Sequence, residues 1–360
     1  MTTVLIMAGG TGGHVFPALA VAAVLRARAC RVVWLGTERG IEARLVPAAG
    51  ISVEWVRVTG LRGKGIGSWL AAPLRLARAL ADALGAIRRT RPDVVLGLGG
   101  FVSGPGGVAA RLLGRPLVVH EQNAIAGTTN RILARIAGTV AEAFPGSFSA
   151  GVGAIVVGNP VRREIEALAG ANAVRTPRTP RQLLVFGGSQ GAALLNRVVP
   201  AALALLPPAV RPAVLHQTGQ GRREAVAADY ASRGMSADVR DFIVDMAAAY
   251  LWADLAISRS GALTVAELAT AGVPALLVPF AAAADDHQTA NARFLTDRGA
   301  AVLLAEHAVT PERLAGELAT VLNADGRRLG AMGTAASRAA SPGAAERLAD
   351  LCLLAAGGGA

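Results

Sequence analysis

The chain has 360 residues, a length that suits two domains of ordinary size better than one. Apolar residues make up 52% of it and charged residues 17%, so there is ample material for buried sheets. Aromatic residues amount to only 4%, and Ala, Leu and Val must therefore fill the cores, which favours helices packed closely on parallel sheets. The net charge of +11 is uneven, because residues 57–91 hold eight basic residues against one acid, Asp82, and this excess predicts an anionic partner.

Several kinds of feature are not expected. The apolar runs are shorter than the roughly 20 residues of a membrane-spanning helix and are broken by glycine and proline. The first residues lack the basic region of a secretory signal. Cys30 and Cys352 are expected to be reduced thiols, although the sequence leaves a disulfide open. Neither these cysteines nor the histidines have metal-ligand spacing, so we expect no metal and no cofactor.

Short β-type runs alternate with helical patterns through the first half of the chain. Helical spacing is found over Ala18–Arg28 and Leu70–Arg88. This alternation is typical of βαβ units in a parallel, doubly wound sheet. The predicted strands are Val4–Met7, Arg31–Leu35, Val53–Val58, Asp93–Leu98, Leu117–His120, Val140–Ala143 and Ile155–Val157.

The first strand leads into a glycine-rich turn, Gly9–Gly13, that is followed by His14. Backbone N–H groups at the start of a helix carry about half a positive charge and suit a phosphate, although a plain tight turn has the same composition. Val15 stands where a dinucleotide fingerprint needs its third glycine, and the chain has no P-loop motif, which disfavours both classes. His14 can accept a proton from a hydroxyl near neutral pH; the alternative is local packing at a helix start.

The basic segment combines charge with apolar side chains. Ile66 and Trp69 follow a basic glycine-rich loop, and Arg75 and Arg78 lie just beyond them, as in a membrane-surface anchor. A solvated basic face is the alternative, and nucleic acid is not expected because the segment lacks interleaved aromatic residues. Apolar residues at helical spacing in the following helix are predicted to face the core: Leu70, Leu74, Ala77, Leu80 or Ala81, Leu84 and Ile87.

Polar residues end a later strand of the first half, at His120-Glu121-Gln122-Asn123. Such residues at the carboxyl end of a parallel strand point into the ligand crevice and suit the hydroxyl and acetamido groups of a sugar. The α/β rhythm restarts near Gln182. The strands predicted there are Gln182–Phe186, Ala213–Gln217, Arg240–Ile243, Leu255–Ser258, Ala275–Val278 and Val302–Leu304.

The second half repeats the opening of the first and adds another motif. Gly187-Gly188-Ser189-Gln190-Gly191 follows its first strand. Further on, a strand ends at Ser258, Ser260-Gly261 makes a turn, and a helix begins near Ala262. Glu267 lies within one to two turns of that helix start, where its carboxylate could bind a ribose diol or could be a solvated helix acid. Two Rossmann-like domains that face each other across a cleft are therefore predicted.

Seven segments together resemble the MurG family of glycosyltransferases, in order along nearly the whole chain. The set is more specific than any one of its members. The segments are Gly9–His14, Val15–Ala20, Gly99–Pro105, His120–Asn123, Gly158–Arg162, Gly187–Ala192 and Arg259–Glu267.

The resemblance implies the GT-B fold and an inverting transfer of N-acetylglucosamine (GlcNAc) from UDP-GlcNAc to the 4-hydroxyl of N-acetylmuramic acid (MurNAc) in undecaprenyl-diphospho-MurNAc-pentapeptide, lipid I. The product is lipid II, made at the cytoplasmic face of the cell membrane by a peripheral protein. The implied acceptor and membrane domain is 1–161 with about 342–360, and the implied UDP-GlcNAc domain is 162–341. The alternatives are a UDP-GlcNAc epimerase, another UDP-sugar:lipid glycosyltransferase, and a non-catalytic nucleotide-binding module.

The resemblance also implies roles for single residues. His14 is our choice for the general base, and Ile243 matches a residue whose backbone meets uracil. Diphosphate and ribose would be held by Ala262 to Glu267, and GlcNAc by Gln288. The residues expected to bind UDP-GlcNAc are Thr11, Gly12, Gly13, Asn123, Arg162, Ser189, Ile243, Ala262, Leu263, Thr264, Val265, Ala266, Glu267 and Gln288.

Overall fold

The computed structural model describes residues 1–360 except 59–71, 171–177, 189–190, 284–285, 324 and 358–360. The predicted sites at Ile66, Trp69 and Ser189 lie outside the described residues. The chain divides into two compact units: unit 1 is Met1–Arg162 with Gly343–Ala360, and unit 2 is Arg163–Pro342. Each is described by itself.

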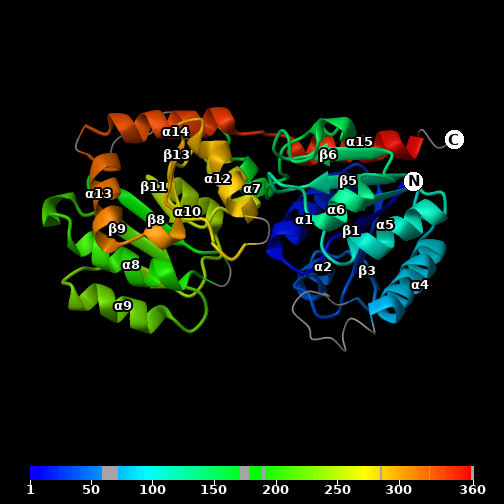
Figure 1. Cartoon of the computed structure of the whole chain (residues 1–360), viewed down its shortest axis with the longest axis horizontal. Coiled ribbons are helices and arrows are strands. Elements are labelled where there is room, and N and C mark those ends of the chain that lie inside the picture. Colours follow the sequence, from blue (N-terminus) through cyan, green and yellow to red (C-terminus); the bar gives the residue numbers. More distant parts are fainter. Residues whose placement is uncertain (59–71, 171–177, 189–190, 284–285, 324, 358–360) are drawn as a thin grey trace. The chain divides into compact units, whose positions relative to one another are not determined.

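Unit 1 is built on a seven-stranded parallel sheet in the order β3-β2-β1-β4-β5-β6-β7. Helices cover both faces of the sheet (Figure 1). The strands are β1 Thr3–Met7, β2 Arg31–Gly36, β3 Ser52–Trp55, β4 Val94–Gly97, β5 Leu117–Glu121, β6 Thr139–Glu142 and β7 Ile155–Val156. The helices are α1 Gly12–Ala27, α2 Glu42–Ala48, α4 Ala72–Thr90, α5 Ser103–Leu112, α6 Thr128–Leu133 and α15 Ala344–Gly357.

The strand β1 supplies both cores of unit 1 because successive side chains of a strand point to opposite faces. Val4 and Ile6 join one buried cluster with residues of α1 and α15. Leu5 and Met7 join the other with residues of α4 and α5. The C-terminal helix α15 thus belongs to the unit that contains the N-terminus, and its Arg347 donates to the carbonyl oxygen of Val157.

Unit 2 has a six-stranded parallel sheet in the order β10-β9-β8-β11-β12-β13. Its strands are β8 Gln182–Phe186, β9 Ala213–Gln217, β10 Asp238–Arg240, β11 Leu255–Ser258, β12 Ala275–Leu277 and β13 Ala301–Leu303. Its helices are α7 Arg163–Glu166, α8 Ala193–Ala204, α9 Arg223–Ser232, α10 Met246–Trp252, α11 Ala262–Thr270, α12 His287–Thr296, α13 Pro311–Val321 and α14 Arg327–Ala339.

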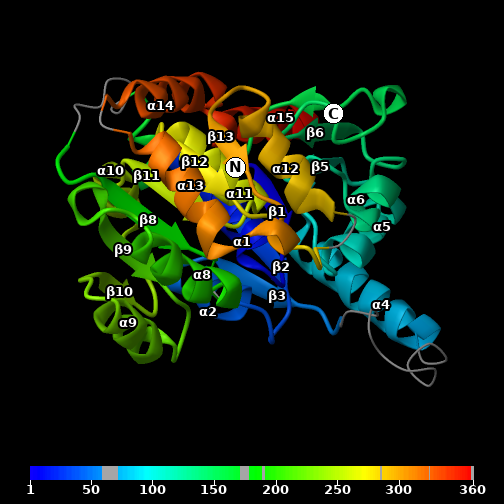
Figure 2. The same ribbon diagram turned by 60° about the vertical axis from the view of Figure 1, so that its left-hand side comes forward.

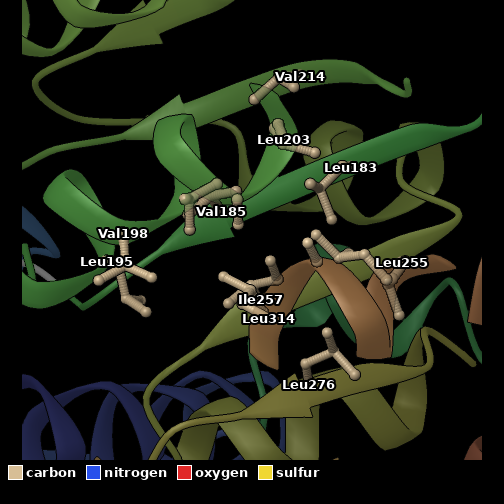
Figure 3. Packing of buried hydrophobic residues seen from close by; sticks show 14 of the residues in the cluster. Leu183, Val185, Leu195, Val198, Leu203, Val214, Leu255, Ile257, Leu276 and Leu314 are labelled. Atoms are coloured by element: carbon tan, nitrogen blue, oxygen red, sulfur yellow. The ribbon is translucent and has the colours of Figure 1, made fainter. Parts of the chain in front are cut away.

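The core of unit 2 is almost entirely aliphatic, as the scarcity of aromatic residues predicts. Leu183 and Val185 of β8 pack with Leu255 and Ile257 of β11, and Leu314 of α13 covers them (Figure 3). Both sheets have the doubly wound strand order, so the predicted α/β class with two Rossmann-like sheets is confirmed.

The predicted core stripe of α4 is wrong at Leu74 and Ala77, and its first member, Leu70, lies outside the described residues. Leu74 is 76% exposed and Ala77 is also exposed, whereas the buried face of the helix is formed by Ala79, Ala83 and Ile87. The first turns of α4 extend beyond the other labelled elements of unit 1 in Figure 2. In the described part of the chain, no helix is both long enough and apolar enough to span a membrane.

The two cysteines are free thiols in the structure. Cys352 of α15 is fully buried, and this burial raises the pKa of its thiol to about 12.

Candidate active site

The strand order of unit 1 reverses between β1 and β4, and open α/β sheets bind ligands at such a point. The glycine turn after β1 and the loop after β4 meet there. Gly100 has a φ of +79°, and a Cβ at this position would lie 2.5 Å from the carbonyl oxygen of Gly9. The close approach of the two loops therefore requires glycine at 100.

His14 lies in the first turn of α1 and is half-buried. Its Nδ1 is 2.8 Å from the side-chain oxygen of Gln122, so two motifs 108 residues apart in sequence come together. A Cβ on Gly99 would lie only 3.0 Å from the His14 ring, so the backbone of this loop packs directly against the imidazole. Thr11, Gly12 and Gly13 precede His14, and the Thr11 carbonyl oxygen accepts from the His14 N–H.

The Glu121 carboxylate orders the loop after β5. It accepts hydrogen bonds from the backbone N–H groups of Asn123 and Gly127 and from the side-chain amide of Asn130. The Asn123 side-chain amide also donates to it, at 3.1 Å. Asn123, the predicted donor contact, is thus held in place by its neighbour.

Glu42 is a site residue that sequence reasoning missed. Its carboxylate is fully buried and accepts from the N–H of Gly10 and from both the N–H and the hydroxyl of Thr37. The Glu42 carboxylate therefore holds the glycine turn of unit 1 in place by accepting a hydrogen bond from its backbone. Local sequence offers no signal for this role, because Glu42 resembles an ordinary acid in the first turn of a helix.

A cavity of about 580 Å³ opens beside this glycine turn. Gly9 and Gly10 line it together with Arg75 and Arg78 of α4 and the half-exposed Phe101. The two arginines predicted to dock on a membrane thus lie close to the phosphate-type turn. The cavity combines the arginine side chains with apolar surface, which suits an amphiphilic anion.

Two basic residues of the segment 57–91 form ion pairs within unit 1. Arg57 forms a two-contact ion pair with Asp82, and this hydrogen bonding lowers the pKa of the Asp82 carboxyl. Arg89 pairs with Glu54 at 2.6 Å. Arg162 stacks on the ring of Phe16, with the guanidinium carbon 5.5 Å from the ring centre.

The strand order of unit 2 reverses between β8 and β11. The amide of Gln217, at the end of β9, joins two loops there: it donates to the carbonyl oxygen of Gly188 and accepts from the N–H of Ile243. Because the N–H of Ile243 is used internally, contact of its backbone with a base would involve the carbonyl group. Gln217 is a second residue that the sequence interpretation did not single out.

The helix α11 begins at this point of the sheet, directly after Gly261. The predicted residues Ala262, Leu263, Thr264, Val265 and Ala266 form its first turns. Ser260 precedes it and donates to the carbonyl oxygen of Gln288, whose own side-chain oxygen accepts from the N–H of Phe280. The predicted GlcNAc contact Gln288 is thereby tied to the loop that begins α11.

Glu267 is 5% exposed, so the alternative of a solvated helix acid is wrong. The hydroxyl of the fully buried Tyr250 donates to its Oε2 at 2.9 Å. The structure therefore presents a buried, oriented carboxylate in α11, whose oxygens can accept hydrogen bonds.

Arg259 has a structural role in unit 2. Its guanidinium donates to the carbonyl oxygens of Val278 and Pro279 and pairs with Glu306 at 2.5 Å. Burial alone would raise the pKa of the Glu306 carboxyl, but hydrogen bonds from Arg259 and the Ala281 N–H lower it below the ordinary value. An anion at Arg259 would have to compete with this carboxylate.

Family models match both halves of the chain. The glycosyltransferase family 28 N-terminal domain matches residues 4–142, and the glycosyltransferase family 28 C-terminal domain matches residues 182–348. The chain belongs to glycosyltransferase family 28. The glycine turn after β1 lies in the N-terminal family 28 domain, and the glycine turn after β8 lies in the C-terminal one.

Relatives within family 28 match almost the full chain. The sequence is 56% identical to a protein of Nitrosococcus oceani over 99% of both chains, named UDP-N-acetylglucosamine--N-acetylmuramyl-(pentapeptide) pyrophosphoryl-undecaprenol N-acetylglucosamine transferase. Among solved structures, the crystal structure of Acinetobacter baumannii MurG matches with a TM-score of 0.83 and 42% sequence identity. The match covers 98% of this chain and 100% of the MurG chain. The predicted GT-B fold is thus confirmed.

A structure of different function shares this fold. UDP-GlcNAc 2-epimerase from Neisseria meningitidis gives a TM-score of 0.68 over 98% of this chain and 100% of its own, at 12% identity. At that identity the likeness concerns the fold alone.

Proposed function

We propose that this protein transfers GlcNAc from UDP-GlcNAc to the 4-hydroxyl of MurNAc in lipid I, with inversion, and so forms lipid II for peptidoglycan synthesis. The observation that carries the proposal is the 56% identity, over 99% of both chains, to a transferase named for this reaction. The site supports it with one protonatable side chain in unit 1 and one buried carboxylate in unit 2.

Unit 2 binds the UDP moiety in this proposal. The N-terminus of α11 is directed at the diphosphate, because its N–H groups carry partial positive charge. Glu267 accepts from the ribose hydroxyls, and Gln288, in the first turn of α12, contacts GlcNAc. Asn123 and Arg162 of unit 1 contact the donor sugar and its phosphates.

His14 acts as the general base. The imidazole removes the proton from the MurNAc 4-hydroxyl as its oxygen forms a bond to the anomeric carbon of GlcNAc. The bond from that carbon to the UDP oxygen breaks in the same step, and UDP leaves with the electron pair. One displacement inverts the configuration and needs no covalent sugar–enzyme intermediate.

The cavity beside the first glycine turn receives the diphosphate of lipid I. Its arginines Arg75 and Arg78 supply positive charge, and Phe101 supplies apolar surface for the first part of the prenyl chain. Leu74 precedes Arg75 on α4, and Leu76 follows it, before Arg78. Both leucine side chains are exposed. This arrangement favours attachment of unit 1 to the anionic cytoplasmic leaflet.

The reaction is tested by measuring UDP release from UDP-GlcNAc with and without a lipid I analogue, and by mass spectrometry of the lipid product. We expect release only with the acceptor, and a product heavier by one GlcNAc. UDP formation or sugar epimerisation without the acceptor would instead indicate an epimerase.

Membrane attachment is tested by replacing Arg75 and Arg78 with Glu and measuring sedimentation with phosphatidylglycerol vesicles. Each basic residue near such a surface contributes about 1 kcal/mol, so we expect the bound fraction to fall steeply. The matched control replaces the exposed Arg327 and Arg328 of unit 2 with Glu. Equal binding by both variants would contradict attachment through α4.

A further inference from the structure

A chain of hydrogen bonds leads from the backbone of Gly158 to His14. His120, at the end of β5, is fully buried, and its Nε2 lies 2.9 Å from the carbonyl oxygen of Gly158. A carbonyl oxygen only accepts, so Nε2 must carry a proton. Burial lowers the pKa of His120 to about 4, so the ring is neutral near pH 7 and its Nδ1 is an acceptor.

The side-chain amide of Gln122 is oriented by two acceptors. Its nitrogen donates to Nδ1 of His120 at 2.9 Å and to the backbone carbonyl oxygen of His120 at 3.0 Å. An amide turned by 180° would place its oxygen against both acceptors and lose both bonds. The amide oxygen of Gln122 therefore faces His14.

This orientation determines the tautomer of His14. The Gln122 oxygen lies 2.8 Å from Nδ1 of His14 and can only accept, so the neutral imidazole carries its proton on Nδ1. Nε2 then has a lone pair. Among the described residues Nε2 has no hydrogen-bond partner, so this lone pair is available for a proton from a substrate hydroxyl.

The groups that support this chain of hydrogen bonds are buried. Asn130 donates to the backbone carbonyl oxygen of His120, and Asn159 donates to that of Gln122 at 2.9 Å. His120 and Gln122 are both at most 1% exposed, so water does not compete for their polar atoms. Gly99 packs against the His14 ring on the side of Nδ1 and Cε1.

We infer that His120 and Gln122 are positioning residues that hold His14 as the Nδ1-protonated tautomer and so direct the basic Nε2 at the acceptor hydroxyl. The inference rests on the proposed function for its consequence in catalysis. The tautomer itself is a property of the free protein. Neither residue needs to touch a substrate in this account.

The first test is a long-range ¹H–¹⁵N NMR spectrum of the protein labelled at histidine, recorded at alkaline pH. The His14→Ala variant assigns the signal. We expect a single neutral tautomer with the proton on Nδ1. Gln122→Leu, which keeps the shape of the side chain but removes its polar atoms, should give a mixture of tautomers. Protonation of His14 on Nε2 in the unaltered protein would overturn the inference, even if Gln122→Leu failed to fold.

The second test separates kcat from KM. His120→Phe should lower kcat roughly 10- to 10²-fold with little change in KM for UDP-GlcNAc, since only the orientation of the base is lost. His120→Gln offers one donor and one acceptor again and should recover most of the rate. His216→Phe makes the same change at a buried histidine of unit 2 and should leave the His14 tautomer unaltered.

The two failures are distinguishable. If the unaltered protein transfers no GlcNAc, the proposed function is wrong, while the NMR spectrum still shows whether the chain of hydrogen bonds fixes His14. If transfer proceeds and Gln122→Leu retains both the wild-type kcat and a single tautomer, the positioning role is wrong and the function stands.

Discussion

The two units use the same doubly wound sheet but hold the glycine turn in different ways. In unit 1 a buried carboxylate, Glu42, accepts from the N–H of Gly10. In unit 2 a neutral amide, Gln217, binds the carbonyl oxygen of Gly188. A carboxylate offsets the positive potential at the start of a helix, whereas an amide does not. In our proposal the turn of unit 2 therefore suits the diphosphate of UDP, whereas in unit 1 Arg75 and Arg78, not the turn itself, supply the positive charge for the diphosphate of lipid I.

A second contrast concerns histidine. Unit 1 directs a half-buried imidazole, His14, toward its loops, whereas His216 of unit 2 is fully buried between Tyr230 and Asn196. In the proposed mechanism the proton acceptor is therefore His14 of unit 1. The same architecture has been given two tasks by a few side chains at the carboxyl ends of its strands.

The largest effect is expected from His14→Ala. Removal of the general base should lower kcat by roughly 10²- to 10⁴-fold with KM for UDP-GlcNAc nearly unchanged. Steady-state UDP release measures both constants, and circular dichroism checks the fold. Near-normal turnover of folded His14→Ala would contradict the role of His14 as the general base.

The buried histidines predict a pH dependence of stability. Burial lowers the pKa of His216 to about 4, below the 6.5 of an unfolded histidine. The unfolded chain thus binds more protons between these values, so the free energy of unfolding falls as the pH drops from 6.5 to 4, by about 3 kcal/mol for this residue. Above pH 6.5 the contribution is constant.

Urea unfolding over this pH range, followed for the wild type and for His216→Phe, isolates that contribution. The variant should lose stability less steeply with acid. Parallel curves for the two proteins would show that His216 is accessible to protons in the folded state.

The electrostatic contrast is tested by Gln217→Glu. The new carboxylate would face the carbonyl oxygen of Gly188 and add negative charge beside the proposed diphosphate site. We expect UDP affinity, measured by isothermal titration calorimetry, to fall roughly 10²-fold. Glu42→Gln in unit 1 is the matched control and should leave UDP affinity within a few-fold of wild type. Equal losses would contradict the assignment of the diphosphate to unit 2.

A smaller effect is expected at the ribose. Glu267→Gln keeps the shape but removes the charge, and UDP affinity should fall about tenfold. Tyr250→Phe removes only the hydrogen bond that orients Glu267 and should cost less. If Glu267→Gln lowered the affinity for a deoxyribose analogue of UDP as much as the affinity for UDP, Glu267 would not contact the ribose hydroxyls.

The strands could be predicted because each is a short apolar run bounded by polar or glycine turns. Most observed strands agree with prediction within a residue or two, but Arg240–Ile243 is displaced, since the strand is Asp238–Arg240. Phe242 and Val244 are exposed, and Ile243 turns inward to donate to Gln217. The alternation of apolar residues there belongs to a loop.

Helix starts were harder to predict. Helix α1 begins at Gly12, six residues before the predicted Ala18, because Pro17 lies inside the helix instead of at its first position. Glu42 and Gln217 act on loops brought near them only by the sheet order, so their local sequence carries little information. Gln217 does share one signal with Glu121: each ends a strand in which three apolar residues are followed by a histidine.

The division of tasks between the units is tested most directly by a crystal structure with UDP. The account predicts that the diphosphate binds at the N-terminus of α11 and that the ribose hydroxyls donate to Glu267. UDP seated instead in the cavity lined by Gly10, Arg75 and Arg78 would contradict it.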